Sequence, residues 1–306
     1  MKAILLALLV AATTGWSAEP LDPTYARQGR LIVTQFVTAP FPHASRVEGH
    51  KYKDKVFPAE KHYRDSTVAI FIPKGFRQTG QVDFVIHFHG WYNTVEGTLR
   101  RFQLIEQLVE SGRNALLVVP EGPHNAPDSA GGKLEDPDGF RRFVDEFVET
   151  LQQRAGFTQR RVAVGKIILS GHSGGYRVIS SVLDRGGLAD KVEEVWLFDA
   201  LYAETGKFLA WWDQERGRLL NIYTDTGGTK DDSEAMMELL KRRGTRFLSA
   251  EEAKVTVEEL RNGRLVFLHT DLGHNDVLEK RKTFGLFLKT SCLAEIKISE
   301  VKAGQR

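Results

Sequence analysis

A serine set between glycines is the part of this sequence best suited to chemistry. Residues 171–175, Gly-His-Ser-Gly-Gly, fit the pattern Gly-x-Ser-x-Gly. The apolar run 166–169 precedes the motif and the amphipathic segment 176–183 follows it. A strand–turn–helix context of this kind presents a serine hydroxyl at the edge of a sheet, where it acts as a nucleophile. The alternative is a turn that merely ends a strand, but this context favours Ser173 as a nucleophile.

The glycines of the motif have a physical reason. The serine occupies a tight turn, and a side chain at Gly171 or Gly175 would collide with the neighbouring helix or strand. The backbone N–H of Gly174 faces the same space at the start of a helix, where negative charge is favoured. The motif therefore predicts a nucleophile beside a donor for an oxyanion.

The elements that must position this serine alternate along the chain. Short β-branched runs alternate with longer segments in which apolar residues recur at helical spacing. Most of the short runs are almost continuously apolar, which is typical of strands buried on both faces. We expect strands at 31–38, 67–73, 84–88, 115–119, 166–169, 192–198, 219–224 and 264–269, and helices at 98–111, 139–153, 176–183 and 276–290.

This order predicts an α/β fold in one domain. The sheet is expected to be doubly wound and mostly parallel, flanked by helices, with its first two strands forming an antiparallel edge. In such sheets, ligand sites lie beyond the carboxyl ends of the strands. From residue 67 to the final helix, the chain resembles the α/β-hydrolase superfamily, and the motif at 171–175 carries the resemblance. Within that superfamily it leans towards polyester depolymerases and carbohydrate-acyl esterases.

The resemblance implies a histidine base in a defined place. A serine hydroxyl needs a base that is itself oriented by a third group, and the superfamily places them in the chain order Ser, acid, His. His274 follows the last predicted strand and precedes the final helix, so it is the expected base. His269 lies within the strand itself, and a satisfied core position suits it better.

Two aspartates are candidates for the acid. Asp225 follows the second strand after the nucleophile, where the superfamily most often has its carboxylate, whereas Asp199 follows the first strand, a position used by a minority of members. The Thr-Asp-Thr-Gly-Gly-Thr around Asp225 is also ordinary turn chemistry. Asp225 is slightly favoured, and Asp199 stays open as the alternative.

A second oxyanion donor is implied upstream. The strand 84–88 leads into His89-Gly90-Trp91, and lipases and esterases have a His-Gly pair at the corresponding place. We expect the N–H of Gly90 or Trp91 to act with that of Gly174, while His89 orients the loop. His87 and His89 share a strand face and suggest a metal, but further ligands do not follow, so no metal and no cofactor are expected.

Aromatic side chains and one long loop are candidates for the substrate pocket. Trp91, Tyr92, Tyr176, Tyr202, Trp211 and Trp212 suit an acyl or sugar pocket, although most are expected to pack in the core or at its edge. The segment 120–137 is either a loop that borders the site or plain surface.

The ends and the composition limit the function further. Residues 1–18 have one lysine, an apolar run and small polar residues, the layout of a secretory signal peptide, which leaves 19–306 as the folded domain. Cys292 is the only cysteine, so neither an internal disulfide nor a lipidated cysteine after the apolar run is available, and no stable membrane anchor is expected. With 42 basic and 40 acidic residues, a nucleic-acid partner is not expected either.

Together these features predict a secreted or periplasmic serine hydrolase that cleaves an ester through an acyl-enzyme intermediate. Carbohydrate-acyl, short-chain and polyester substrates all remain open, as does the oligomeric state. A serine peptidase or amidase on the same fold is one alternative, and a binding protein that keeps the fold without the chemistry is another.

Overall fold

The computed structural model describes residues 24–157, 162–214 and 217–296. The predicted signal segment, 1–18, lies outside the described residues. Within them, no helix combines the length and apolar character needed to span a bilayer.

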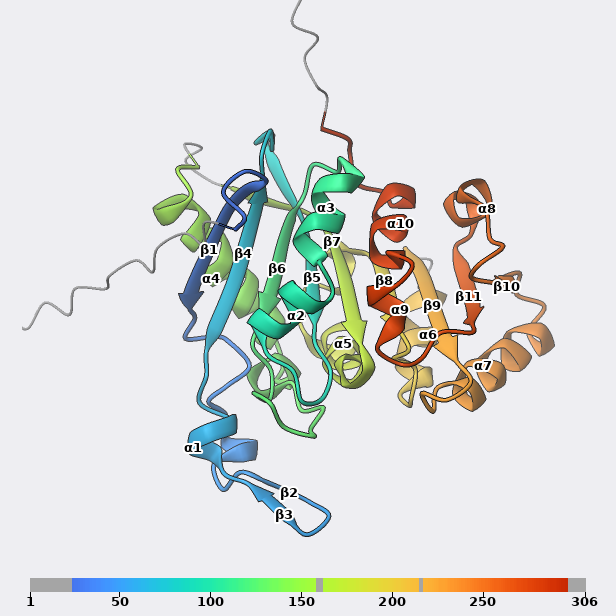
Figure 1. Cartoon of the computed structure of the whole chain (residues 1–306), viewed down its shortest axis with the longest axis horizontal. Helices are drawn as coiled ribbons and strands as arrows, with labels where there is room; N and C mark the ends of the chain where they lie inside the picture. The colour runs from blue at the N-terminus through green and yellow to red at the C-terminus, as the bar shows by residue number, and fades with distance from the viewer. Residues whose placement is uncertain (1–23, 158–161, 215–216, 297–306) are drawn as a thin grey trace, which may run out of the picture.

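One nine-stranded sheet runs through the molecule (Figure 1). Its strand order is β1-β4-β6-β5-β7-β8-β9-β11-β10. The seven strands from β6 to β10 in this order pair in parallel, while β4 is antiparallel to both β1 and β6. The strands are β1 (Gly29–Gln35), β4 (Thr67–Pro73), β5 (Gln81–Phe88), β6 (Leu116–Pro120), β7 (Ala163–His172), β8 (Val192–Phe198), β9 (Arg218–Thr224), β10 (Leu248–Glu251) and β11 (Leu265–Thr270).

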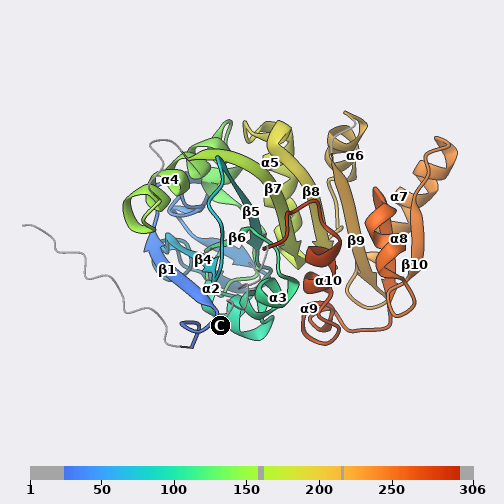
Figure 2. The same ribbon diagram turned by 90° about the horizontal axis from the view of Figure 1, so that it is seen from above.

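Helices cover both faces of this sheet, and each face has its own apolar core (Figure 2). One face packs against α4 (Gly139–Arg154), α5 (Tyr176–Arg185), α6 (Thr205–Asp213) and α7 (Lys230–Arg242). The other packs against α2 (Val95–Arg101), α3 (Leu104–Ser111), α8 (Val257–Asn262), α9 (Asp276–Glu279) and α10 (Thr283–Thr290). The predicted doubly wound, mostly parallel α/β architecture with an antiparallel edge is therefore confirmed.

Two predicted helices are each divided in two. The helix expected at 98–111 is interrupted at Gln103, whose backbone is left-handed with a φ of +49°. The helix expected at 276–290 is interrupted at Lys282 in the same way, with a φ of +51°. Neither residue is a glycine or a proline, so the sequence gives no local sign of the breaks.

A small hairpin stands apart from the main sheet. The strands β2 (His50–Tyr52) and β3 (Lys55–Phe57) pair only with each other, and α1 (Ala59–His62) follows them. The hairpin projects beyond the main sheet at the end where β7 leads into α5 (Figure 1). Neither strand was predicted, because three residues are too few to show an alternating pattern.

Candidate active site

Ser173 lies on a strained turn between β7 and α5. The residues Ser173–Gly175 form one 3-10 turn between the two elements. Ser173 has a φ of +53°, in the left-handed region that costs a non-glycine residue about 1 kcal/mol or more. A Cβ at Gly171 would lie 2.7 Å from the Cδ1 of Ile179, and one at Gly175 would lie 2.6 Å from the carbonyl oxygen of Phe88. The turn thus needs glycine at both positions, as the motif predicted.

His274 and Asp199 form a close pair. His274 lies between β11 and α9, and its Nδ1 is 2.5 Å from Oδ2 of Asp199. The Asp199 side chain is 0% exposed and the His274 side chain 28% exposed. Because a carboxylate only accepts, Nδ1 carries the proton, which leaves Nε2 as the basic nitrogen of His274. The imidazole can therefore take up a proton while its partner stays ionised.

The turn after β9 holds the Asp199 carboxylate. The amide of Thr224 donates to Oδ1 (3.1 Å) and its hydroxyl to Oδ2 (2.9 Å), and the hydroxyl of Thr229 also donates to Oδ1. A Cβ at Gly227 would lie only 1.7 Å from Oδ2, so the turn closes directly over the carboxylate. Burial raises the pKa of Asp199, but hydrogen bonds from His274, Thr229 and Thr224 outweigh it and lower that pKa below its ordinary value.

Asp225, the slightly favoured candidate for the acid, lies elsewhere. Its carboxylate is exposed and lies 2.7 Å from Nζ of Lys230 and 3.2 Å from Nε2 of His269. The structure thus brings Asp199 to His274 and leaves Asp225 outside the pair. The expectation for His269 also needs correction, because its side chain is 25% exposed and its Nδ1 lies 3.0 Å from Glu251. Residues on the turn around Asp225 hold the other aspartate.

His172 is a residue of the site that the sequence analysis did not single out. Its Nε2 donates to the carbonyl oxygen of His274 (3.0 Å), and the two rings lie 4.7 Å apart at 32°. Its other neighbours include Phe102, whose ring is 5.2 Å away. Burial, followed by the nearby His274, lowers the pKa of His172 to about 3, so the ring stays neutral at ordinary pH. His274 therefore rests against the residue that precedes Ser173.

The predicted oxyanion residues also meet at Ser173. A Cβ at Gly90 would lie 2.6 Å from the Cβ of Ser173 and 3.2 Å from its Oγ, so this loop passes beside the hydroxyl. A Cβ at Gly174 would lie 2.9 Å from Cδ1 of Trp91, so the indole covers Gly174. The amide of the next residue, Tyr92, donates instead to the carbonyl oxygen of Ala126 (3.1 Å). The structure thus places Gly90, Trp91 and Gly174 around the serine.

The side chain of His89 holds the loop that contains Gly90 and Trp91. Its Nδ1 donates to the carbonyl of Gly90 (2.9 Å), and its Nε2 lies 3.0 Å from Oε1 of Glu121. Burial opposes ionisation of both groups, but hydrogen bonds with His124 and His89 lower the pKa of Glu121 to about 2. The same contact with Glu121 raises the pKa of His89. His89 therefore orients the loop through its buried contacts with Gly90 and Glu121.

The histidines weighed as metal ligands do not share a site. The Nδ1 of His87 lies 2.9 Å from Oγ of Ser170, while His89 turns to Glu121. A different trio, Asp65, Glu121 and His124, brings one ligand atom each within 4.8 Å of the others. Glu121, and to a smaller degree Asp65, raises the pKa of His124. In this cluster the imidazole of His124 lies between two carboxylates.

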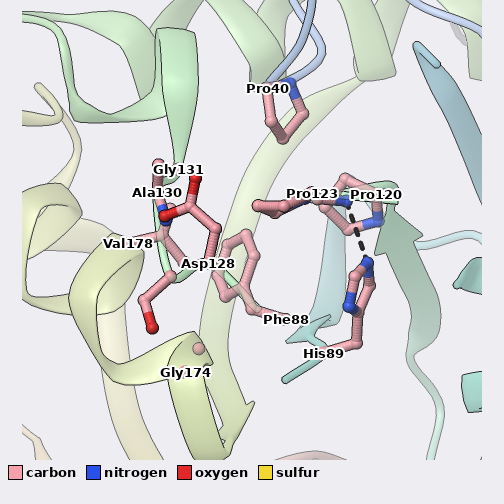
Figure 3. Close-up of a pocket in the computed structure, with 13 residues that line it drawn as sticks. Pro40, Phe88, His89, Pro120, Pro123, Asp128, Ala130, Gly131, Gly174 and Val178 are labelled. Atoms are coloured by element: carbon pink, nitrogen blue, oxygen red, sulfur yellow. Dashed lines mark hydrogen bonds between the residues drawn. The ribbon is translucent and has the colours of Figure 1, made fainter. Parts of the chain in front are cut away.

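A narrow pocket opens beside the oxyanion loop (Figure 3). In that view, the labelled His89, Pro120 and Pro123 lie on one side and Asp128, Ala130 and Gly131 on the other, with Phe88 between them and Gly174 below. The hydroxyl of Ser129, which also lines the pocket, accepts a hydrogen bond from the indole N–H of Trp91 (2.8 Å). The segment 120–137 therefore borders the site, which decides between the two alternatives for it.

Aromatic side chains lie on the His274 side of the serine as well. The ring of Tyr202 is 5.7 Å from that of Tyr176 and 6.4 Å from that of His274. Burial, opposed in part by a hydrogen bond with Ser173, raises the pKa of Tyr202 to about 12. Trp211, in contrast, is 2% exposed and packs in the core. Of the aromatic residues singled out, Trp91, Tyr176 and Tyr202 lie at the site.

Comparisons with known proteins establish the fold. The sequence matches no protein-family model and no curated protein. Among solved structures, the fluorophosphonate-binding serine hydrolase F (FphF) of Staphylococcus aureus shares 11% identity with a TM-score of 0.51, over 86% of this chain and 99% of that one. A feruloyl esterase module from Clostridium thermocellum, complexed with sinapinate, shares 11% identity with a TM-score of 0.51, over 86% of this chain and 88% of that module. A ferulic acid esterase shares 13% identity with a TM-score of 0.50, over 74% of this chain and 92% of that one. The chain therefore has the α/β-hydrolase fold, as expected.

The glycine requirement of the turn predicts a local loss of stability. In Gly175→Ala, the added methyl group meets the Phe88 carbonyl oxygen at 2.6 Å. We expect the free energy of unfolding to fall by about 1–3 kcal/mol, measured by urea denaturation. Gly80→Ala is the control, because a Cβ there has nothing within 4 Å. Equal midpoints for the two variants would contradict the tight turn.

Proposed function

We propose that this chain is a serine hydrolase that cleaves carboxylic esters through an acyl-enzyme intermediate. The observation that carries the proposal is the buried Asp199 bound to Nδ1 of His274 (2.5 Å), with His274 resting on the residue before Ser173. A fold alone does not determine function, so the proposal depends on this arrangement. Two of the similar structures are named as esterases, which agrees with it.

The geometry supports a reaction in two steps. Nε2 of His274 takes the hydroxyl proton as Oγ of Ser173 attacks the ester carbonyl carbon, and the amides of Gly174 and of Gly90 or Trp91 stabilise the oxyanion. The imidazolium, stabilised by Asp199, returns the proton to the leaving alkoxide, so an alcohol departs and an acyl-serine remains. Water then attacks the acyl-serine with the same base, which releases the acid and restores the hydroxyl.

We further propose that the protein acts after export, in the periplasm or outside the cell. The support is the layout of residues 1–18, which is that of a cleavable signal peptide. Comparing the mass of the mature protein from the exported fraction with that of the full chain tests this. A product that keeps residues 1–18 and stays in the cytoplasm would contradict it.

The first test is turnover of small esters by residues 19–306. We expect hydrolysis of p-nitrophenyl acetate or butyrate, and we expect Ser173→Ala to lower kcat/KM by about a thousandfold or more. Ser249→Ala, an exposed serine on β10, is the control and should keep full activity. A fluorophosphonate probe should label the wild type and Ser249→Ala but not Ser173→Ala. Faster turnover of p-nitroanilides than of esters would indicate an amidase instead.

The second test separates the two aspartates. Asp199→Asn removes the carboxylate that fixes the His274 tautomer, and we expect kcat to fall by about a thousandfold or more. Asp225→Asn changes an exposed residue that contacts Lys230 and His269, so we expect activity within about twofold of the wild type. Steady-state kinetics on p-nitrophenyl acetate measure both. A larger loss for Asp225→Asn would reverse the assignment.

The third test concerns His172 as a positioning residue. His172→Phe keeps a ring against His274 but removes the donor to its carbonyl, so we expect kcat to fall by about ten- to a hundredfold. His172→Gln, which keeps an N–H donor, should restore much of the loss. The unfolding midpoints of both variants show whether stability alone explains the effect. Equal activity of the two variants would argue against this role.

A further inference from the structure

The β2–β3 hairpin adjoins the oxyanion loop through aromatic contacts. The ring of Tyr52 meets that of Trp91 edge-on at 5.1 Å, and the ring of Phe57 lies 6.3 Å from that of Tyr92. Trp91 in turn covers Gly174, next to Ser173. A molecule bound along the hairpin would therefore lie within one aromatic side chain of the serine.

Exposed apolar side chains concentrate here. Trp91 is 40% and Tyr92 56% exposed, and they are the large aromatic residues most exposed to solvent within the described ranges. Val56 on β3 and Val47 just before the hairpin are exposed as well. Both rings keep a solvent-exposed part beside Ser173 although each packs against a ring of the hairpin, and flat rings of this kind stack on sugars and other planar groups.

The hairpin also carries unpaired positive charge. Lys51, Lys53 and Lys55 are exposed, and Asp54 is the single acidic residue of the segment 50–57. Among the described residues, none of the three ammonium groups forms an ion pair with a carboxylate. Lys53 lies at the tip with its Nζ 5.4 Å from the Tyr52 ring, while Lys55 pairs across the hairpin with Tyr52. Tyr52 and Lys55 thus share the hairpin face that meets Trp91, with Lys53 at the tip, whereas Lys51 pairs with Val56 and lies on the opposite face.

We infer that Trp91, Tyr92 and the β2–β3 hairpin form a binding platform for an acidic polysaccharide that carries the ester. The rings stack on the sugar rings, and Lys53 and Lys55 attract the uronate carboxylates of neighbouring sugars. This inference deepens the proposed function and rests on it, since it places the ester of the bound chain at Ser173. The whole chain has a formal net charge of only +2, so the attraction of a polyanion depends on where lysines gather on its surface.

Binding is tested apart from turnover. Ser173→Ala protein should bind polygalacturonate at low ionic strength, and the double change K53E and K55E in that background should weaken the binding by about tenfold. The matched control is K74E and K191E, two exposed lysines at the opposite, amino-terminal edge of the parallel strands. Equal affinity of the two double variants would overturn the inference, whether or not esters are hydrolysed.

Turnover then tests specificity. The wild type should show a higher kcat/KM on O-acetylated polygalacturonate than on neutral acetylated glucomannan at low salt, and 0.5 M NaCl should remove this preference. The hairpin double variant, K53E and K55E, should lose the preference while hydrolysing p-nitrophenyl acetate normally. Asparagine tolerates the φ of +54° at position 92. We therefore expect Tyr92→Asn to lower kcat/KM on both polymers and to leave kcat/KM on p-nitrophenyl acetate unchanged. Equal kcat/KM on the two polymers, or a preference for aliphatic polyester, would overturn the inference, whereas no turnover of any small ester would refute the proposed function.

Discussion

The burial of the Asp199 carboxylate constrains the rest of the site. An ionised carboxylate without solvent is costly unless donors surround it. Here His274, Thr224 and Thr229 supply those donors, and Gly227 allows the turn to close over them. Because the charge needs its partners, the imidazole of His274 has a fixed orientation and a fixed tautomer. The β9–α7 turn, the β11–α9 loop and the end of β8 are thereby held together at one point.

Backbone strain appears at the two residues that this arrangement most needs to aim. Ser173 and Asp199 are both non-glycine residues in the left-handed region, with φ values of +53° and +45°. Each directly follows a buried parallel strand, β7 or β8, whose pairing with its neighbours fixes where the strand ends. The sheet thus holds two unfavourable conformations in place, which is the usual relation between a rigid scaffold and a reactive site. The packed helices on both faces supply the stability that this strain costs.

Much of the fold was accessible from the sequence, and the reasons are local. Buried strands are almost continuous apolar runs, so β4 and β8 were predicted with the bounds that the structure shows. The nucleophile motif needs glycines for steric reasons that any chain shares. The division of the helices at Gln103 and Lys282 was missed, because a left-handed residue other than glycine leaves no mark in composition. The hairpin and the short edge strand β10 were missed because they are too brief to show periodicity.

The carboxylate that contacts His274 was harder to predict than the serine or the histidine, because both aspartates end a strand at the same edge. What distinguishes them is the third dimension: Thr224, Gly227 and Thr229 point back at Asp199, while Asp225 turns to solvent. The threonines of this turn were a usable signal for a bound carboxylate, because their hydroxyls can donate to one. The same residues also suit a plain turn. His172 gave no signal, because the motif accepts any residue there. Its role depends on His274, which lies a hundred positions further along the chain.

The separateness of the hairpin has a consequence for how this protein changes over evolutionary time. The strands β2 and β3 pair with each other and share no ladder with the nine-stranded sheet. Insertions, deletions or new side chains in this finger therefore leave the register of β5, β7 and β8 untouched. The hairpin touches the oxyanion loop through side-chain rings and shares no backbone pairing with the sheet, so its surface can diversify while the sheet is kept. A fold of this design can acquire new substrates by exchanging a few residues at its rim.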